Sequence, residues 1–426
     1  MAMTITEKIL AAHSGEESVK PGDLIQAKVD LAMGNDLSTI SAIGRLEKVG
    51  ATEVWDPDKI AIVMSHFTPN KDIATAELTK KIRAWVDQVK IPHYFEVGQG
   101  GIEHVVLPEK GFIKPGMVII GGDSHTCTYG ALGCFATGVG ATDLAGIFIT
   151  GEVWLKVPET LRFEFHGTPD KWVSAKDLVL LAISKVGVDG ARYRAVEYSG
   201  QPIDDLDMSG RLTLVNMAVE MGAKNGVIHV DDTTRSYLKE RGITNSYTEY
   251  ASDEDANYLD VIDCDLSGMS PLVAFPPSPD LAKPVEEAAG IKVDQVVIGS
   301  CTNGRLEDLT IAADILRGKK TKKGTRLIVL PGSQDVYLEA LKAGVIEVLV
   351  EAGGAVSTPT CGACLGGHMG VLASDEVCLS TTSRNYAGRM GHRDAQIYLC
   401  NPAVAAASAI TGEITHPKLV AEEVPV

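Results

Sequence analysis

Three cysteines stand at spacings that could hold a metal centre with one open coordination position. Cys301 ends the apolar run VVIGSC, and the pair Cys361 and Cys364 follows in STPTCGACLGG. A closed zinc site or a fully ligated iron-sulfur cluster takes four protein ligands, so three thiolates leave one position for water or substrate. A Lewis-acid catalyst requires such an open position.

Two alternatives to a metal centre stay open at this point. Some of the three cysteines could be ordinary buried thiols, as we expect for the other five, which lie in or beside apolar runs: Cys127, Cys134, Cys264, Cys378 and Cys400. The closely spaced pair could also be a thioredoxin-like redox couple. The sequence LGGHMG that follows the pair is unlike the amphipathic helix of such couples and disfavours this alternative.

A second polar group follows another apolar run. Asp123, Ser124 and His125 in GGDSHT place a carboxylate, a hydroxyl and an imidazole together, which could orient a substrate or relay a proton. A Ser-His-Asp hydrolase is excluded, because adjacent residues of an extended chain point alternately to opposite faces. The alternative is a polar turn with an aspartate cap.

Two more histidines lie near strand ends. His66 ends IAIVMSH and His104 follows GQGGIE, while Glu220 and Asn216 lie one turn apart in a helical stretch and could support an imidazole. A strand-end histidine is often only a hydrogen-bonded structural residue, and Glu220 could be a solvated helix charge. Together with His125, these residues indicate a site with several imidazoles.

Two arginines complete the candidate site. Arg384 and Arg389 in TTSRNYAGRMGH carry guanidinium groups suited to bidentate binding of carboxylates. A surface ion pair is the alternative. Beside an open-site metal, two arginines would define a pocket for a small dicarboxylate or tricarboxylate.

The elements that must position these residues alternate along the chain. Amphipathic patterns at 74–89 and 335–353 predict helices between short β-branched runs, which lie at 59–66, 115–125, 294–301, 325–332 and 376–385. This alternation predicts α/β layers with largely parallel sheets, in which ligands collect at the carboxyl ends of the strands. The polar motifs follow such ends.

Composition excludes several classes of function. A chain of 426 residues with 45% hydrophobic content should form two to four domains. The net charge of −17 disfavours binding to nucleic acid or anionic membrane. No apolar run is long enough to span a bilayer, and the first residues lack the order of a signal peptide, so we expect a cytoplasmic protein with reduced cysteines. Neither a Walker motif nor a clean GxGxxG supports nucleotide binding.

A proline-rich stretch marks one domain boundary. Residues 270–284 carry five prolines, which predicts a linker that is neither helix nor central strand. The chain is thus divided into a first α/β domain at 1–127, a second with the linker at 128–284, and a third with the cysteines at 285–426.

Four motifs together resemble one family. GGDSHTCTYGALG, IGSCTNGR, TPTCGACLGGHMG and TTSRNYAGR are similar to the aconitase superfamily, in particular the free-standing large subunits of the isopropylmalate dehydratase, homoaconitase and 2,3-dimethylmalate dehydratase type. The resemblance runs over essentially the whole chain. It implies three α/β/α domains around an iron-sulfur cluster. The fourth, swivelling domain of the superfamily is expected on a separate small subunit.

The resemblance also implies roles for individual residues. One 4Fe-4S cluster per chain would be held by Cys301, Cys361 and Cys364, and its open iron would bind the substrate hydroxyl and a carboxylate. Catalysis is assigned to His66, His104, His125, Asp123 and Glu220, and substrate binding to Ser124, Asn216, Arg384 and Arg389. The small subunit would supply the catalytic serine and a further arginine.

The sequence departs from the family pattern at three places. Ser65 replaces the aspartate that usually precedes the histidine at position 66, and we expect this to lower the pKa of His66 and loosen its orientation. NDLSTI at 35–40 and Ala363 inside the cysteine pair also differ from the usual residues. These differences keep two substrates open, 3-isopropylmalate and 2,3-dimethylmalate.

The predicted function is therefore a hydro-lyase subunit that reversibly dehydrates a branched malate. A homoaconitase-type hydratase is the alternative within the family. A non-catalytic iron-sulfur protein for electron transfer or iron sensing is the alternative from another class, and it would leave the histidines and arginines without a role. Binding of RNA by a cluster-free form is disfavoured by the acidic charge.

Overall fold

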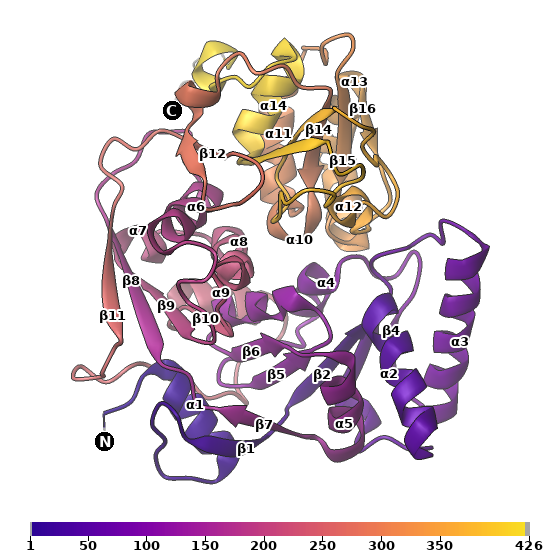
Figure 1. Cartoon of the computed structure of the whole chain (residues 1–426), viewed down its shortest axis with the longest axis vertical. Coiled ribbons are helices and arrows are strands. Elements are labelled where there is room, and N and C mark those ends of the chain that lie inside the picture. Colours follow the sequence, from indigo (N-terminus) through magenta and orange to yellow (C-terminus); the bar gives the residue numbers. More distant parts are fainter. Residues whose placement is uncertain (1, 422–426) are drawn as a thin grey trace.

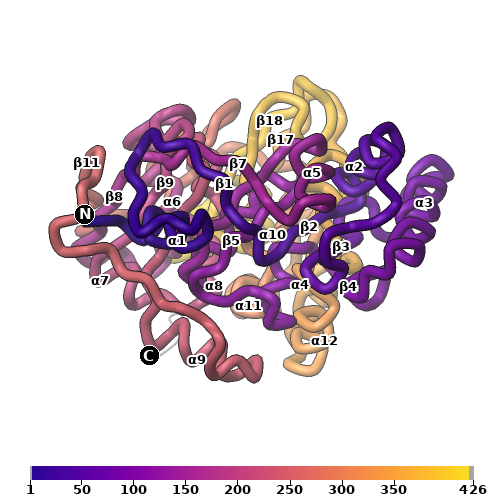
Figure 2. The backbone as a smooth tube through the Cα atoms, turned by 90° about the horizontal axis from the view of Figure 1, so that it is seen from below, coloured from indigo at the N-terminus to yellow at the C-terminus, as the bar shows by residue number. Residues whose placement is uncertain are grey.

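Three larger sheets with their helices and one two-stranded ribbon make up the described part of the chain. The computed structural model describes residues 2–421. Figure 1 shows the last sheet and its helices at the top, the first sheet at the lower right and the second at the lower left. Seen from below in Figure 2, α3 and β11 lie at opposite edges of the molecule, so the first and second sheets stand side by side. The helices α4, α8 and α10 lie where the three parts meet (Figure 1).

The first sheet has five strands in the order β4-β3-β2-β5-β6, all parallel. Its strands are β2 (Leu31–Asn35), β3 (Ile60–Val63), β4 (His93–Phe95), β5 (Val118–Gly121) and β6 (Phe135–Gly138). Its helices are α1 (Ile5–Ser14), α2 (Asp36–Val49), α3 (Ile73–Val89), α4 (Glu103–Glu109) and α5 (Ala141–Thr150). The helix expected at 74–89 is confirmed as α3. A two-stranded antiparallel ribbon of β1 (Leu24–Lys28) and β7 (Glu152–Lys156) follows this part.

The second sheet has four parallel strands in the order β10-β9-β8-β11. They are β8 (Thr160–His166), β9 (Ala195–Ser199), β10 (Asn225–Val227) and β11 (Asp260–Asp265). Its helices are α6 (Ala175–Val186), α7 (Gln201–Asp204), α8 (Met208–Asn216) and α9 (Asp232–Glu240). Ser174 caps α6, because its hydroxyl accepts a hydrogen bond from a backbone N–H of the first turn.

The third sheet has seven strands in the order β13-β12-β18-β17-β14-β15-β16. The five strands from β18 to β16 run parallel, whereas β12 and β13 are antiparallel additions. The strands are β12 (Leu272–Ala274), β13 (Ala282–Pro284), β14 (Gln295–Gly299), β15 (Arg326–Leu330), β16 (Gly354–Val356), β17 (Val377–Ser380) and β18 (Gln396–Leu399). The helices are α10 (Ser300–Asn303), α11 (Leu306–Leu316), α12 (Gln334–Lys342), α13 (Val345–Glu351) and α14 (Pro402–Thr411).

Two local expectations were wrong. The proline-rich segment 270–284 does contain a central strand, because its proline-free residues 272–274 form β12 between two other strands. The helix expected at 335–353 is broken into α12 and α13, because Gly344 takes a left-handed conformation with φ 74°.

One apolar core joins the three sheets. It contains Val63 of the first sheet, Phe163 of the second and Val297 of the third, all fully buried. Such close-packed interiors hold their surroundings rigidly, so the strand ends of different sheets keep fixed relative positions. The α/β architecture with largely parallel sheets is confirmed. The strands of the first sheet extend to Gly138 and those of the third begin at Leu272. The division at 127 and 284 stays a prediction.

Among the described residues, no helix combines the length and the apolar character needed to cross a bilayer.

Candidate active site

The carboxyl ends of parallel strands bring the predicted residues together. In the first sheet, β2, β3 and β5 end at nearly the same level, since Asn35 pairs with Val63 and Met33 with Gly121. The chain segments that follow these ends carry Asp36, His66 and the trio Asp123 to His125. In the third sheet, β14, β16 and β17 lead to Cys301, Cys361 and Arg384. The site is thus built largely from chain segments that follow strand ends, as the sequence predicts.

A tight turn positions Cys301. Gly299 ends β14 with φ 130°, and a Cβ there would lie 2.0 Å from the carbonyl oxygen of Leu330. Only glycine fits so close to the backbone of β15. The turn delivers Cys301 to the start of α10, which packs against α8 and α4. The Sγ atom of Cys301 lies 3.8 Å from the Oδ1 atom of Asn216 at the end of α8.

The loop with the other two cysteines is attached to the first sheet. The backbone N–H of Cys361 donates to the carbonyl oxygen of Ser65 at 2.9 Å, and the hydroxyl of Thr360 donates to the same oxygen at 3.0 Å. The ring of His368 lies 3.0 Å from the carbonyl oxygen of His66. These contacts across about 300 residues of sequence hold Cys361 beside the His66 loop.

A cavity of about 210 Å³ lies between these loops. Ten of the twelve predicted site residues line it: His66, His104, Asp123, Ser124, His125, Cys301, Cys361, Cys364, Arg384 and Arg389. The other two, Asn216 and Glu220, lie behind the lining and contact Cys301 and His125. Leu37, Ile102, Glu103 and Leu365 also line the cavity and were not predicted.

The orientation of His66 does not depend on an aspartate at position 65. Its Nδ1 atom lies 3.0 Å from the Oδ1 atom of Asp36 and 2.9 Å from the hydroxyl of Ser65. Asp36 also accepts backbone hydrogen bonds from His66 and from Phe67. Burial alone would lower the pKa of His66, but the hydrogen bond and charge of Asp36 raise this pKa to about 9. The expected fall in the pKa of His66 was therefore wrong, because a residue thirty positions earlier supplies the carboxylate.

Asp123 holds the other two histidines. Its carboxylate lies 2.9 Å from the Nε2 atom of His104, and it accepts a hydrogen bond from the backbone N–H of His125 at 2.8 Å. Burial would raise the pKa of Asp123, but hydrogen bonds with His104 and His125 hold it well below its ordinary value. The phenol of Tyr129 lies 3.2 Å from the Nδ1 atom of His104 and fixes the other side of that ring.

Glu220 links an imidazole to a guanidinium. Its Oε1 atom lies 2.8 Å from the Nε2 atom of His125 and accepts a hydrogen bond from the Nε atom of Arg384 at 2.7 Å. Arg384 also donates to the hydroxyl of Ser124 at 3.0 Å. Burial would raise the pKa of Glu220, yet its hydrogen bond with His125 and the charge of Arg384 lower it. This network fixes Arg384 at the cavity wall.

Arg389 lines the cavity and keeps an unused hydrogen-bond donor. Its Nη1 atom donates to the hydroxyl of Tyr386 at 3.2 Å, and its Nη2 atom lies 3.7 Å from the Sγ atom of Cys364. Its Nε atom is buried and has no partner among the described residues. A buried guanidinium donor without a partner is costly and suits an anionic ligand.

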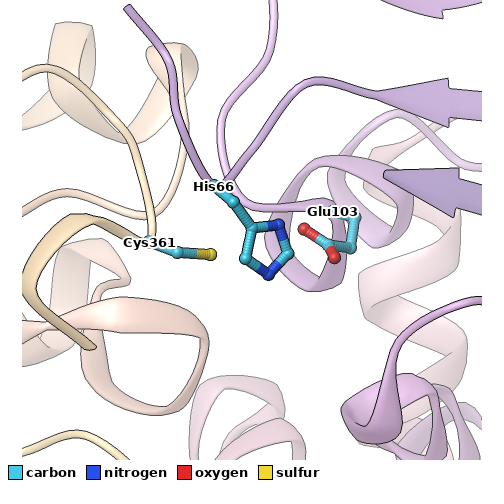
Figure 3. Close-up of side chains that lie close together, drawn as sticks. All are labelled: His66, Glu103 and Cys361. Carbon is cyan, nitrogen blue, oxygen red and sulfur yellow. The ribbon is translucent and has the colours of Figure 1, made fainter. Parts of the chain in front are cut away.

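Glu103 is the main residue that sequence reasoning missed. Figure 3 shows the ring of His66 between the carboxylate of Glu103 and the sulfur of Cys361, and the ligand atoms of the three residues lie within 4.8 Å of one another. Glu103 is 1% exposed, and its Oε2 atom has no hydrogen-bond partner among the described residues. It directly precedes His104 on α4, where no strand end marked it.

Comparisons with known proteins identify the family of the chain. The model of the aconitase family (aconitate hydratase) matches residues 7–412. The chain belongs to the aconitase family. It is 57% identical over 421 residues to a 3-isopropylmalate dehydratase large subunit from Desulfitobacterium hafniense, covering 99% of this chain and all of that protein. It is 55% identical over 420 residues to the protein of the same name from Moorella thermoacetica, with the same coverage.

A solved structure of an aconitase-family protein shares the fold. The crystal structure of Thermococcus kodakaraensis aconitase X in its holo form matches with a TM-score of 0.50 and 14% identity, covering 90% of this chain and 93% of that one. The predicted resemblance to the aconitase superfamily is confirmed. The predicted enzyme class, an aconitase-like hydro-lyase, is confirmed with it.

Membership of the aconitase family implies an iron-sulfur cluster, and the cavity fits one. Its wall carries three free cysteines. Among the described residues, groups whose ligand atoms all lie within 4.8 Å do not include the three sulfurs together. Sulfur ligands of a single zinc ion at about 2.3 Å would lie closer than that, so the spacing suits a larger group. The unpartnered atoms of Glu103 and Arg389 beside it are polar groups that such a site would employ.

Proposed function

We propose that this chain is the cluster-bearing large subunit of a hydro-lyase that reversibly dehydrates a branched malate, either 3-isopropylmalate or 2,3-dimethylmalate. One observation carries the proposal: a single cavity is lined by three cysteines, three histidines and two arginines. The names of the full-length relatives support the isopropylmalate substrate. The departures at 35–40 and at Ala363 keep the dimethylmalate substrate as the second candidate.

The three cysteines are proposed to hold a 4Fe-4S cluster. Cys301, Cys361 and Cys364 would supply three thiolates, so one iron would remain open. When bound, the cluster supplies a Lewis acid for the substrate hydroxyl. Burial raises the pKa of Cys361 well above its ordinary value, so this thiol is protonated at neutral pH until a metal takes the place of the proton.

His66 is proposed to donate the proton to the departing hydroxyl. Hydroxide is a poor leaving group, and a positioned acid helps it to leave by protonating it. The pKa of His66, raised to about 9, keeps its imidazole protonated at neutral pH. Asp36 contacts the Nδ1 atom of His66, so the Nε2 atom is the one that can donate a proton. The Nε2 atom lies 3.8 Å from the carboxylate of Asp123.

The arginines are proposed to bind the two carboxylates of the malate. Arg384 is held by Glu220 and Ser124, whereas Arg389 has a buried donor without a partner. Fixed guanidinium groups bind carboxylates in defined orientations and stabilise charge that develops beside the deprotonated carbon. The wall also contains apolar side chains that suit a branched alkyl group, namely Leu37, Ile102 and Leu365.

A small subunit is proposed as the partner that completes the site. The relatives are named large subunits, which supports a second chain. Removal of the proton from carbon needs a base, and by the family resemblance a serine of the small subunit provides it. Histidines of the described cavity are engaged by Asp36, Asp123 and Glu220, which favours positioning and acid roles for them.

The test is anaerobic reconstitution of this chain with iron, sulfide and its small subunit. Both malates are assayed by absorbance of the unsaturated product, and Cys301→Ser serves as the matched control. Turnover of one substrate that disappears in C301S supports the proposal and selects the substrate. Turnover that C301S retains, or a chain that binds no cluster, contradicts it.

A further inference from the structure

A lysine without a carboxylate partner is buried behind the end of β17. Lys176 on α6 is 0% exposed. Its Nζ atom donates to the carbonyl oxygens of Thr381 at 2.9 Å and Thr382 at 2.6 Å. No carboxylate of residues 2–421 lies within 4.0 Å of this atom. The adjacent Asp177 is directed elsewhere, since it accepts hydrogen bonds from Ser174, Leu272 and Asn401.

Another fully buried cation, on the helices of the second sheet, is paired with a carboxylate. Arg211 on α8 is also 0% exposed, and its guanidinium donates two hydrogen bonds to the carboxylate of Asp231, at 2.7 and 2.6 Å. Burial of a charge costs several kcal/mol unless an opposite charge is close. Arg211 therefore shows how this fold accommodates a buried cation, and Lys176 departs from that arrangement.

Most of the groups that could supply negative charge to Lys176 are cysteines. Burial lowers the pKa of Lys176 to about 8, and the groups that oppose this effect are Cys400, Cys301, Cys364 and Asp177, in that order. Cys301 and Cys364 belong to the proposed cluster site. Thiolates of Cys301 and Cys364 bound to a metal group would therefore supply the negative charge that no carboxylate within 4.0 Å supplies to Lys176.

Backbone contacts connect Lys176 to the same turn. Thr381, whose carbonyl oxygen accepts from Lys176, accepts a hydrogen bond from the N–H of Gly299 through its hydroxyl at 2.9 Å. Its hydroxyl also donates to the carbonyl oxygen of Gly299 at 3.1 Å. Gly299 begins the turn to Cys301, and the Thr381 segment continues to Arg384. Lys176 is therefore fixed directly behind the cysteine turn.

We propose that Lys176 is the buried countercharge of the three-thiolate group, which it stabilises and whose reduction it favours. The inference rests on the proposed cluster at Cys301, Cys361 and Cys364. A fixed cation behind thiolates stabilises the bound anionic group and stabilises its reduced state most, because that state carries one more negative charge. A residue with this role acts on the bound group rather than on the metal-free fold.

The test compares Lys176→Gln, Lys176→Arg and the control Arg211→Gln in the reconstituted chain. Glutamine keeps N–H donors for the two carbonyls but removes the charge. We expect K176Q to lower the midpoint potential of the cluster in an EPR-monitored titration. We also expect chelators to remove the cluster about tenfold faster, a factor that corresponds to roughly 1.4 kcal/mol. K176R should retain the wild-type potential, and R211Q should lower the unfolding temperature without changing the potential.

The remaining outcomes are also decisive. A K176Q chain with the wild-type potential and wild-type rate of cluster loss overturns the inference while the proposed function stands. If K176Q folds but binds no cluster, the result for K176R decides. Cluster binding by K176R then supports a role for the charge, whereas a K176R chain without a cluster overturns the inference. Metal-free K176Q that does not fold overturns it too, because a countercharge is not needed before its anion is present. A wild-type chain that binds no cluster removes the proposed function itself.

Discussion

Replacement of Asp36 by asparagine should lower the pKa of His66 strongly. Asp36 supplies the hydrogen bond and the nearest charge that raise this pKa from 6.5 to about 9. Because one pKa unit corresponds to about 1.4 kcal/mol, Asp36 and the weaker charges of Glu103 and Asp123 favour the imidazolium by roughly 3 kcal/mol more than burial disfavours it. In D36N burial remains and opposes the charge, so the pKa of His66 should fall to about 6 or below.

The assay is a pH titration of carbon-13-labelled histidine rings by NMR in the metal-free chain, with His66→Gln to assign the signal. Ser65→Ala is the matched control, because it removes only the neutral hydroxyl that lies 2.9 Å from the same ring nitrogen. We expect S65A to change the pKa of His66 much less than D36N does. A D36N chain whose His66 still titrates near pH 9 would refute the account of this ring.

The same pair predicts a pH dependence of stability. The folded pKa of His66 lies above the unfolded value, so its contribution to the free energy of unfolding is complete below pH 6.5 and is lost as the pH rises through about 9. The difference in unfolding free energy between wild type and D36N should therefore shrink over this range. Urea titrations at pH 6 and pH 10 measure it, and an equal difference at both would contradict the prediction.

Three further predictions concern the cavity. Cys361→Ser should abolish binding of iron and sulfide, measured by elemental analysis, whereas Cys264→Ser in β11 should retain it; equal binding in both would contradict the three-thiolate site. Glu220→Gln should lower kcat/KM roughly thirtyfold, because a charged hydrogen bond is worth about 2 kcal/mol. An unchanged kcat/KM would mean that this carboxylate does not position the site. Arg389→Lys should raise KM about tenfold with a smaller change in kcat, since a lysine lacks the guanidinium fork; initial-rate kinetics measure this, and an unchanged KM would exclude Arg389 from substrate binding.

Sequence reasoning located most of the cavity because its residues follow strand ends. His66, His125 and Cys301 each come directly after an apolar run, and parallel strands of one sheet bring such ends to one edge. The alternation of elements likewise predicted the α/β sheets. The strand-end pattern locates only residues whose position is set by the strand that precedes them. Their chemical roles stay predictions.

The residues that were missed depend on contacts between distant segments. Asp36 also follows a strand end, yet its value lies in reaching His66 from the neighbouring strand, which no local pattern shows. Lys176 lies on a helix, and a charged helix residue is ordinarily expected to face solvent. It is buried instead, because the third sheet packs over it. Glu103 has no strand end before it. The substitution at Ser65 was misjudged for the same reason, because the compensating carboxylate is distant in sequence.

The contacts that attach Cys361 to the Ser65 loop have a consequence for biosynthesis. During translation, Ser65 and His66 are synthesised long before Cys361 and Cys364. The cavity that these residues line together is therefore incomplete while most of the polypeptide is being made. A group held by all three cysteines can be complete only after translation has passed residue 364. Binding of iron and sulfide would therefore show that the chain has been made past residue 364. Truncated or stalled chains would bind neither.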